Sequence, residues 1–182
     1  KDGILPASFF KPDTICDFYV DEDRKKVWGV MLDMLIKFSK VCEEHNLTWY
    51  FVAGSLLGAV RHHGFVPWDD DLDVALPRKD YEKFLTLAYE FEDPYFLQTP
   101  YTDKGYFYSH AKLRNSNTSA VDYPFQYQGF NMGIFLDIHP MDNFERTQEA
   151  RELFDNQTKL IIDNSIAMRL THPNLSDRDK IR

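Results

Sequence analysis

The sequence predicts a single α/β domain with a mixed β-sheet and with helices near both of its ends. Apolar side chains recur at helical spacing between Val27 and Cys42, and short β-branched or aromatic segments alternate with helical patterns further on. The chain of 182 residues is long enough for one sizeable core, and it contains neither an internal repeat nor a low-complexity linker. We expect an N-terminal arm over residues 1–22, the domain over 23–170, and a polar tail over 171–182 of the kind left by a truncated chain.

The first two elements are an arm and a long helix. Prolines and scattered aromatic residues make residues 1–20 look irregular. Asp21 or Asp23 then provides an N-cap, because an aspartate side chain accepts hydrogen bonds from the first free amides of a helix. The apolar spacing carries this amphipathic helix to about Asn46.

The remaining elements alternate between strands and helices. Gly54 and Ser55 are expected to form a turn between the first strand and a short helix. Pro77 stands where a later helix can begin, because its fixed φ suits the first helical position. The expected strands are residues 48–53, 71–76, 95–98, 110–114, 119–123 and 130–139, and the expected helices are residues 56–62, 77–88 and 145–170.

Composition excludes several classes of protein. The net charge of −8 argues against broad binding to nucleic acid. Cys16 and Cys42 stand alone, which argues against a disulfide framework or a zinc site and favours a reducing compartment. No apolar run reaches the roughly 18 residues of a membrane span, and no export signal is visible. We therefore expect a cytoplasmic protein, in solution or at the inner face of the membrane.

Four aspartates, Asp69, Asp70, Asp71 and Asp73, lie between two apolar segments. On a strand, Asp69, Asp71 and Asp73 would share one face, because strand side chains alternate. Two carboxylates about 4 Å apart repel by roughly 4 kcal/mol at an effective dielectric near 20. Asp71 and Asp73 are therefore candidate ligands for Mg²⁺ or Mn²⁺, with a solvated acidic loop as the alternative. Asp69 is expected to support the site, and Asp70 to be a cap or a surface charge.

A further carboxylate, Asp137, interrupts an otherwise apolar strand. Beside Asp71 and Asp73 it would complete the ligand set of a two-metal phosphoryl-transfer site. Alternatively it serves as the general base that accepts the proton of an attacking hydroxyl, a role for which Asp142 is the nearby competitor. A salt bridge to an arginine or a lysine is the third interpretation of Asp137.

Five residues are candidates for binding substrate phosphates. Gly54 permits close backbone approach, and Ser55 is expected either to donate to a phosphate or to cap the following helix. Arg61 is interpreted either as a bidentate phosphate ligand or as an ion-pair partner of the aspartates. Lys112 and Arg114 alternate onto one strand face, where they would meet a diphosphate or face solvent.

The chain is also rich in aromatic residues, at 15 %. Trp68 and the cluster of Tyr101, Tyr106, Phe107 and Tyr108 are candidates for stacking on a base or for enclosing a quaternary ammonium. Packing in the core is the alternative for each of them.

The segment GSLLGAVRHHGFVPWDDDLDVALPRKDYEKF, residues 54–84, resembles the signature of the LicD family. That family is similar to the DNA polymerase β-like nucleotidyltransferases, which pair a Gly-Ser turn with a later Asp-hydrophobic-Asp-hydrophobic strand. Here these motifs are Gly54-Ser55 and residues 71–74. The similarity spans roughly residues 25–145 and includes FLDIHPMD, residues 135–142. It implies a nucleotidyltransferase-like mixed sheet flanked by helices.

The resemblance also implies a reaction. The family includes phosphocholine transferases that use CDP-choline, and relatives such as fukutin-related protein that transfer ribitol phosphate from CDP-ribitol. By resemblance, this protein would use Mg²⁺ or Mn²⁺ to move a phospho-alcohol from CDP-choline or another CDP-alcohol. Phosphocholine is the leading candidate for the group that is moved. The acceptor would be a hydroxyl of a cell-surface glycan, such as lipopolysaccharide or teichoic acid. LicD proteins are usually longer than this chain, which leaves the acceptor-binding part open. The alternatives are transfer of a nucleoside monophosphate from a nucleoside triphosphate, and a non-catalytic nucleotide-binding remnant.

Overall fold

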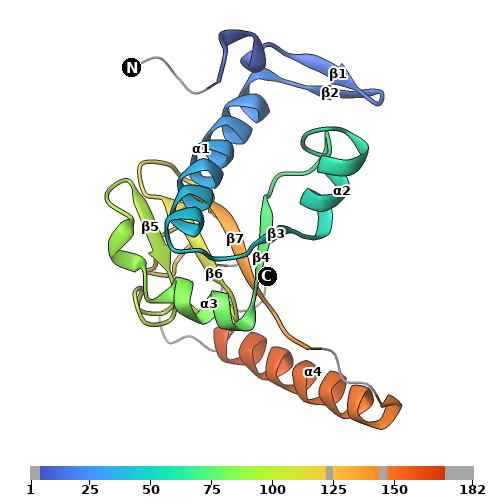
Figure 1. The fold of residues 1–182 in the computed structure, drawn as a ribbon, viewed down its shortest axis with the longest axis vertical. Helices are drawn as coiled ribbons and strands as arrows, with labels where there is room; N and C mark the ends of the chain where they lie inside the picture. Colours follow the sequence, from blue (N-terminus) through green and yellow to red (C-terminus); the bar gives the residue numbers. More distant parts are fainter. Residues whose placement is uncertain (1–4, 122–124, 144–146, 171–182) are drawn as a thin grey trace.

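The computed structural model describes residues 5–121, 125–143 and 147–170, with the backbone alone over 161–170. Its described part contains a five-stranded sheet, a separate two-stranded sheet and four α-helices (Figure 1). The predicted α/β class is therefore confirmed. The expected polar tail over 171–182 lies outside the described residues.

The five-stranded sheet is mixed, as predicted. Its strand order is β3–β4–β7–β6–β5, formed by Tyr50–Phe51, Asp73–Pro77, Ile134–Met141, Ala111–Asn115 and Tyr95–Gln98. Strands β4 and β7 run parallel, whereas the other neighbouring pairs are antiparallel. The parallel pair lies inside the sheet, so that residues from distant parts of the sequence meet there.

Helix α1, Glu22–Glu44, packs on the sheet against β6 and β7 (Figure 1). Its N-cap is Asp21, whose side chain accepts a hydrogen bond from the Arg24 amide at 2.7 Å. Acidic residues in the first turn stabilise the helix, because their negative charge lies near the positive end of its dipole. The apolar residues that α1 buries follow the predicted helical spacing: Trp28, Met31, Met34, Phe38, Val41 and Cys42. They face the buried strand residues Leu113, Leu136 and Ile138, which belong to the same core.

Three more helices follow. Helix α2, Ala53–Arg61, lies beside β3 and β4, and helix α3, Arg78–Leu85, packs against β4 and β7. Helix α4, Gln148–Leu170, lies at the end of the molecule opposite the N-terminal hairpin (Figure 1). Helix α4 falls within the expected helical range of 145–170, of which residues 145 and 146 lie outside the described residues.

The N-terminal arm is more ordered than the sequence predicts. A short 3₁₀ helix, Ala7–Phe10, precedes a hairpin of β1, Asp13–Ile15, and β2, Phe18–Val20. The two residues of the hairpin turn, Cys16 and Asp17, both have positive φ, at 50° and 61°. Turns of this kind match the twist of paired strands but usually contain Asn-Gly or Asp-Gly. The absence of that sequence signal explains why the expectation of irregular structure was wrong.

Two other expectations need correction. Gly54 and Ser55 do not form a turn, because they belong to the first turn of α2, and the change of direction takes place at Ala53, with φ of 50°. The strand expected over 119–123 is not formed by residues 119–121, and the rest of it lies outside the described residues. Ala120 instead donates a single backbone hydrogen bond to the Met132 carbonyl.

Candidate active site

Three carboxylates from two neighbouring strands converge at one end of the parallel pair. Asp73 opens β4 and lies directly opposite Asp137 of β7, and the Asp137 amide donates to the Leu72 carbonyl at 2.9 Å. Asp71 lies just before β4 rather than within it, which differs from the expected strand over 71–76. One carboxylate oxygen from each of Asp71, Asp73 and Asp137 lies within 4.8 Å of the others. The three residues are therefore as close as the sequence analysis expects.

The carboxylates differ in charge environment. Burial, the nearby charges of Asp73 and Asp69, and a hydrogen bond with Asp69 raise the pKa of Asp71 to about 7. Burial would also raise the pKa of Asp137, but hydrogen bonds and charge from His110 and Lys112 outweigh it and hold that pKa below its usual value. Negative charge at Asp71 is therefore uncompensated, whereas at Asp137 it is balanced.

These residues fit a hard divalent cation. The donor set consists of carboxylate oxygens, which Mg²⁺ and Mn²⁺ prefer. Burial and the neighbouring carboxylates raise the pKa of Asp71, so ionising all of these carboxylates together is unfavourable. A cation held by Asp71, Asp73 and a carboxylate oxygen of Asp137 would relieve that repulsion.

Two histidines that the sequence analysis did not single out orient the aspartates. His110 Nε2 lies 3.0 Å from Asp137 Oδ1, and His139 Nε2 lies 3.1 Å from Asp73 Oδ1. Their ring centroids are 4.3 Å apart. The alternation of β7 already placed His139 on the same strand face as Asp137, but nothing local indicates that His110 lies beside it. Hydrogen bonds of this kind orient metal-ligating groups.

Lys112 and Arg114 are buried and contact other protein groups, which differs from the expected contact with a diphosphate. The Lys112 ammonium contacts Asp137 Oδ1 and lies 3.7 Å from the Phe135 ring centroid, with only 4 % of the residue exposed. Arg114 donates to the Gln98 side chain and to the Gly133 carbonyl. The solvated sheet face considered as the alternative is also not observed. For Asp137, the structure contains the salt bridge that the sequence analysis held as a third interpretation.

The Gly-Ser pair holds the acidic segment against α2. Ser55 Oγ accepts a hydrogen bond from the Asp73 amide at 2.7 Å. A Cβ on Gly54 would lie only 2.3 Å from Asp69 Oδ2, so glycine allows Asp69 to approach. Ser55 does not cap the helix as one interpretation proposed, because Val52 occupies the N-cap position.

Arg61 and Asp142 lie apart from the three carboxylates. Arg61 ends α2, donates to His62 Nε2 at 2.8 Å and places its guanidinium 5.9 Å from the Trp68 ring centroid. Within the described ranges, no ion pair joins it to an aspartate. Asp142 instead forms a surface ion pair with Arg78, so its proposed competition with Asp137 for the role of base has no support in the structure.

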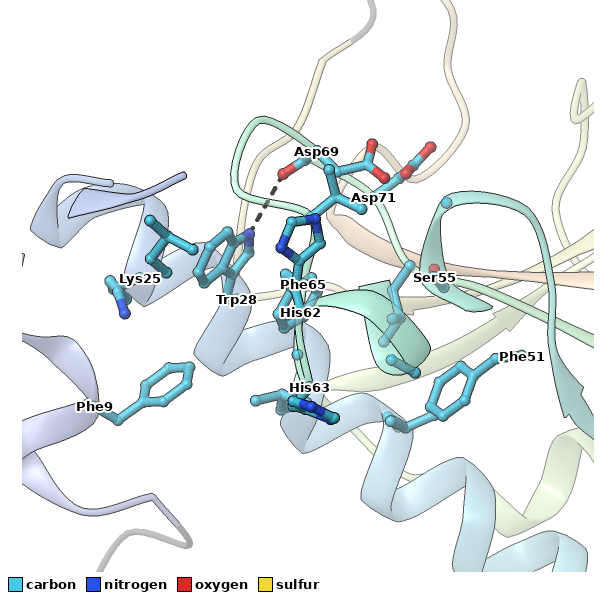
Figure 2. Close-up of a pocket in the computed structure, with 18 residues that line it drawn as sticks. Phe9, Lys25, Trp28, Phe51, Ser55, His62, His63, Phe65, Asp69 and Asp71 are labelled. Carbon is cyan, nitrogen blue, oxygen red and sulfur yellow. Dashed lines mark hydrogen bonds between the residues drawn. The ribbon is translucent and has the colours of Figure 1, made fainter. Parts of the chain in front are cut away.

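A cavity of about 520 Å³ adjoins the acidic segment (Figure 2). Residues from the N-terminal arm, α1, α2 and the loop after α2 line it, and Asp69 and Asp71 lie at one side. The Asp69 carbonyl accepts hydrogen bonds from Arg24 at 2.9 Å and from the Trp28 indole at 3.4 Å, which ties the acidic segment to α1. The sequence does not reveal this cavity, because its walls come from four separate segments.

The aromatic residues considered for binding divide into two groups. Tyr106, Phe107 and Tyr108 contact one another, and Tyr106 is 5 % exposed, so the core interpretation holds for Tyr106. Tyr101 is 93 % exposed and Trp68 is 52 % exposed. Their proposed role in binding a ligand stays a prediction.

Comparison with known proteins is consistent with this geometry. A family model described as "LicD/FKTN/FKRP, nucleotidyltransferase domain" matches residues 46–173. The chain is 38 % identical over 71 residues to the lipopolysaccharide cholinephosphotransferase LicD of Haemophilus influenzae, which is 38 % of this chain and 27 % of that protein. It is also 39 % identical over 49 residues to an uncharacterized protein of Rickettsia typhi, which is 27 % of this chain and 16 % of that protein. The matches thus span about a quarter or less of the relatives' length.

No helix in the described ranges is both long and apolar enough to cross a membrane.

The family match covers more than two thirds of the chain, including the acidic segment and β7. The chain therefore belongs to the LicD family, as the resemblance in its sequence indicates.

Proposed function

We propose that the protein transfers a phospho-alcohol from a CDP-linked donor to a hydroxyl of a cell-surface glycan, with phosphocholine as the leading candidate for the group that is moved. The observation that carries this proposal is the convergence of Asp71, Asp73 and Asp137 beside a cavity large enough for a small-molecule ligand. Membership of the LicD family supports a transferase. The name of the Haemophilus influenzae relative supports choline phosphate as the group moved and lipopolysaccharide as the acceptor class.

In this proposal, Asp71 and Asp73 hold Mg²⁺ or Mn²⁺, and Asp137 is either a further ligand or the general base. The bound cation would neutralise charge on the diphosphate of the donor. His110 and Lys112 keep Asp137 ionised and oriented, because both donate to its Oδ1. The ionised Asp137 is thus available to accept the proton of the glycan hydroxyl as it attacks phosphorus, with CMP as the leaving group.

The phosphates of the donor would lie near the start of α2. Ser55 Oγ already accepts from the Asp73 amide, so its own proton remains available for a phosphate oxygen. Gly54 lets the Asp69 carboxylate lie against the start of the helix, and Arg61 would provide positive charge from the far end of α2. Lys112 acts through Asp137 in this scheme. Arg114 has no part in it, since its guanidinium donates to protein acceptors.

The test is turnover with defined donors. Purified protein with Mg²⁺, CDP-choline and a lipopolysaccharide acceptor is expected to release CMP and to label the glycan with phosphocholine. Asp71→Asn and Asp73→Asn are each expected to reduce turnover by about 100-fold or more, because they remove charge that the cation requires. Asp70→Asn, an exposed neighbour, is the matched control.

Three outcomes would count against the proposal. Wild-type turnover in both Asp71→Asn and Asp73→Asn would contradict the metal site. Pyrophosphate release from a nucleoside triphosphate, without CMP release from CDP-choline, would show nucleotidyl transfer instead. Binding of CDP-choline with no turnover of any donor would indicate a non-catalytic domain.

A further inference from the structure

Lys25 is a buried lysine on α1 that lines the cavity. Only 8 % of the residue is exposed, and its ammonium lies 5.5 Å from the ring centroids of both Phe9 and Trp28. Among the described residues, no carboxylate, carbonyl or hydroxyl accepts a hydrogen bond from its Nζ. The neighbouring Lys26 differs, since it is exposed and pairs with Glu22 and Asp23.

A buried ammonium without an acceptor is costly, because it has lost water and gained no hydrogen bond. The contacts with Phe9 and Trp28 offset part of this cost, but a ring face does not accept three hydrogen bonds. A ligand in the cavity that offers an oxygen or nitrogen acceptor to Lys25 would supply the missing partner. The position of Lys25 therefore indicates that a ligand presents a hydrogen-bond acceptor at this end of the cavity.

The other walls are partly aromatic. Trp28 and Phe65 stack on each other with their centroids 4.7 Å apart and an interplanar angle of 6°, and Figure 2 shows Phe51 across the cavity from Lys25. Aromatic side chains also pack against nucleobases. The volume of about 520 Å³ lies in the usual range for small-molecule sites.

Charge distinguishes between the two ends of a CDP-alcohol. The Lys25 ammonium repels a quaternary ammonium such as choline, because both groups are cationic. It attracts a ring carbonyl oxygen or an unprotonated ring nitrogen, both of which a pyrimidine presents. Asp69 and Asp71 lie at another side of the same cavity, toward the proposed cation and the diphosphate (Figure 2).

We infer that the cavity binds the pyrimidine base of the nucleotide donor, and that Lys25 donates a hydrogen bond to the acceptor edge of that base. The inference rests on the proposed function, since that function supplies the nucleotide donor. It makes Lys25 a determinant of donor specificity and places the alcohol end of the donor outside this cavity.

The test compares Lys25→Met with Lys26→Met. Methionine keeps an unbranched side chain that reaches as far as the lysine Cε, but it removes the ammonium group that donates hydrogen bonds. Binding of CMP and of phosphocholine is measured by calorimetry in buffer with Mg²⁺. Loss of one charge-assisted hydrogen bond predicts a roughly 10- to 100-fold weaker affinity of Lys25→Met for CMP. Its affinity for phosphocholine, and both affinities of Lys26→Met, should equal those of the wild type.

A second measurement shows that the variant is folded. Lys25→Met should unfold at a higher temperature than the wild type, because an apolar group replaces a buried charge that has no hydrogen-bond acceptor among the described residues. Quenching of tryptophan fluorescence by CMP should be retained at higher CMP concentration, since Trp28 remains beside the base.

The outcomes separate this inference from the proposed function. Unchanged CMP affinity in Lys25→Met would overturn the role of Lys25 while CMP binding by the wild type still supports a nucleotide donor. Loss of phosphocholine affinity instead of CMP affinity would show that the alcohol occupies the cavity, which also overturns it. If the wild type binds neither CMP nor CDP-choline, both the proposed function and this inference are wrong.

Discussion

Asp73 and Asp137 lie directly opposite each other on the parallel strands β4 and β7. Because these strands belong to one sheet, their side chains emerge on the same face at the same height. Each carboxylate is held by a histidine, Asp73 by His139 and Asp137 by His110. This pairing creates the acidic site, and Asp71 joins it from the loop that precedes β4.

Cation binding should stabilise the protein. Mg²⁺ or Mn²⁺ at about 100 times its dissociation constant is expected to raise the free energy of unfolding by roughly 2.7 kcal/mol. Thermal unfolding with and without EDTA measures the effect. Asp73→Asn should abolish most of it, because Asp73 is one of the three converging carboxylates. Equal stabilisation of Asp73→Asn and wild type would show that the cation binds elsewhere.

The stability of the metal-free protein should depend on pH through Asp71. Its pKa is raised to about 7, so the folded carboxyl binds a proton more tightly than the unfolded one. This protonation favours the folded state at low pH, and the advantage is lost as pH rises through about 7. Asp71→Asn should therefore be more stable than the wild type by about 2 kcal/mol near pH 8 in EDTA, but not near pH 4. Urea unfolding at both pH values measures this difference, with Asp70→Asn as the control.

The ion pair of Lys112 with Asp137 should be important for stability. Lys112→Met leaves Asp137 buried with His110 as its remaining partner among the described residues, which is expected to cost about 3 kcal/mol. Because the pKa of Asp137 is lowered, this contribution is present at neutral pH and is lost as pH falls below about 4. Urea unfolding at neutral pH tests the prediction. Lys40→Met, which removes an exposed pair with Glu44, should have no measurable effect.

Two glycines of α2 should respond differently to alanine. A Cβ on Gly58 would lie 2.5 Å from the Gly64 carbonyl oxygen, and backbone cannot easily move away. Gly58→Ala is therefore expected to destabilise the protein by about 2 kcal/mol. In Gly54→Ala the close atom is the carboxylate of Asp69, which can rotate away, so stability should change by less than about 1 kcal/mol.

The same pair of variants also tests the function. Gly54→Ala displaces Asp69 from its position beside Asp71, so turnover should fall although the fold is retained. Thermal unfolding and CMP release, measured on both variants, provide the comparison. A large loss of stability in Gly54→Ala, or none in Gly58→Ala, would contradict the packing described for α2.

Much of the fold could be predicted because its signals are local. The N-cap at Asp21 and the apolar spacing of α1 depend on residues within a few turns of one another. Strand β5 has the predicted limits, and the alternation of β7 correctly places Leu136 and Ile138 in the apolar core and Asp137 on the opposite strand face. The start of α2 was missed because a non-glycine residue, Ala53, adopts the positive φ there.

The sequence by itself determined the acidic ligand candidates, the strand face on which Asp137 lies and the family to which the chain belongs. The tertiary structure alone decided what surrounds them. His110 and Lys112 reach Asp137 because the antiparallel pairing of β6 with β7 places Lys112 opposite it. Lys25 is left facing a cavity because the arm, α1 and α2 meet around it. Such contacts depend on strand register and on packing between distant segments, which no local spacing of residues encodes.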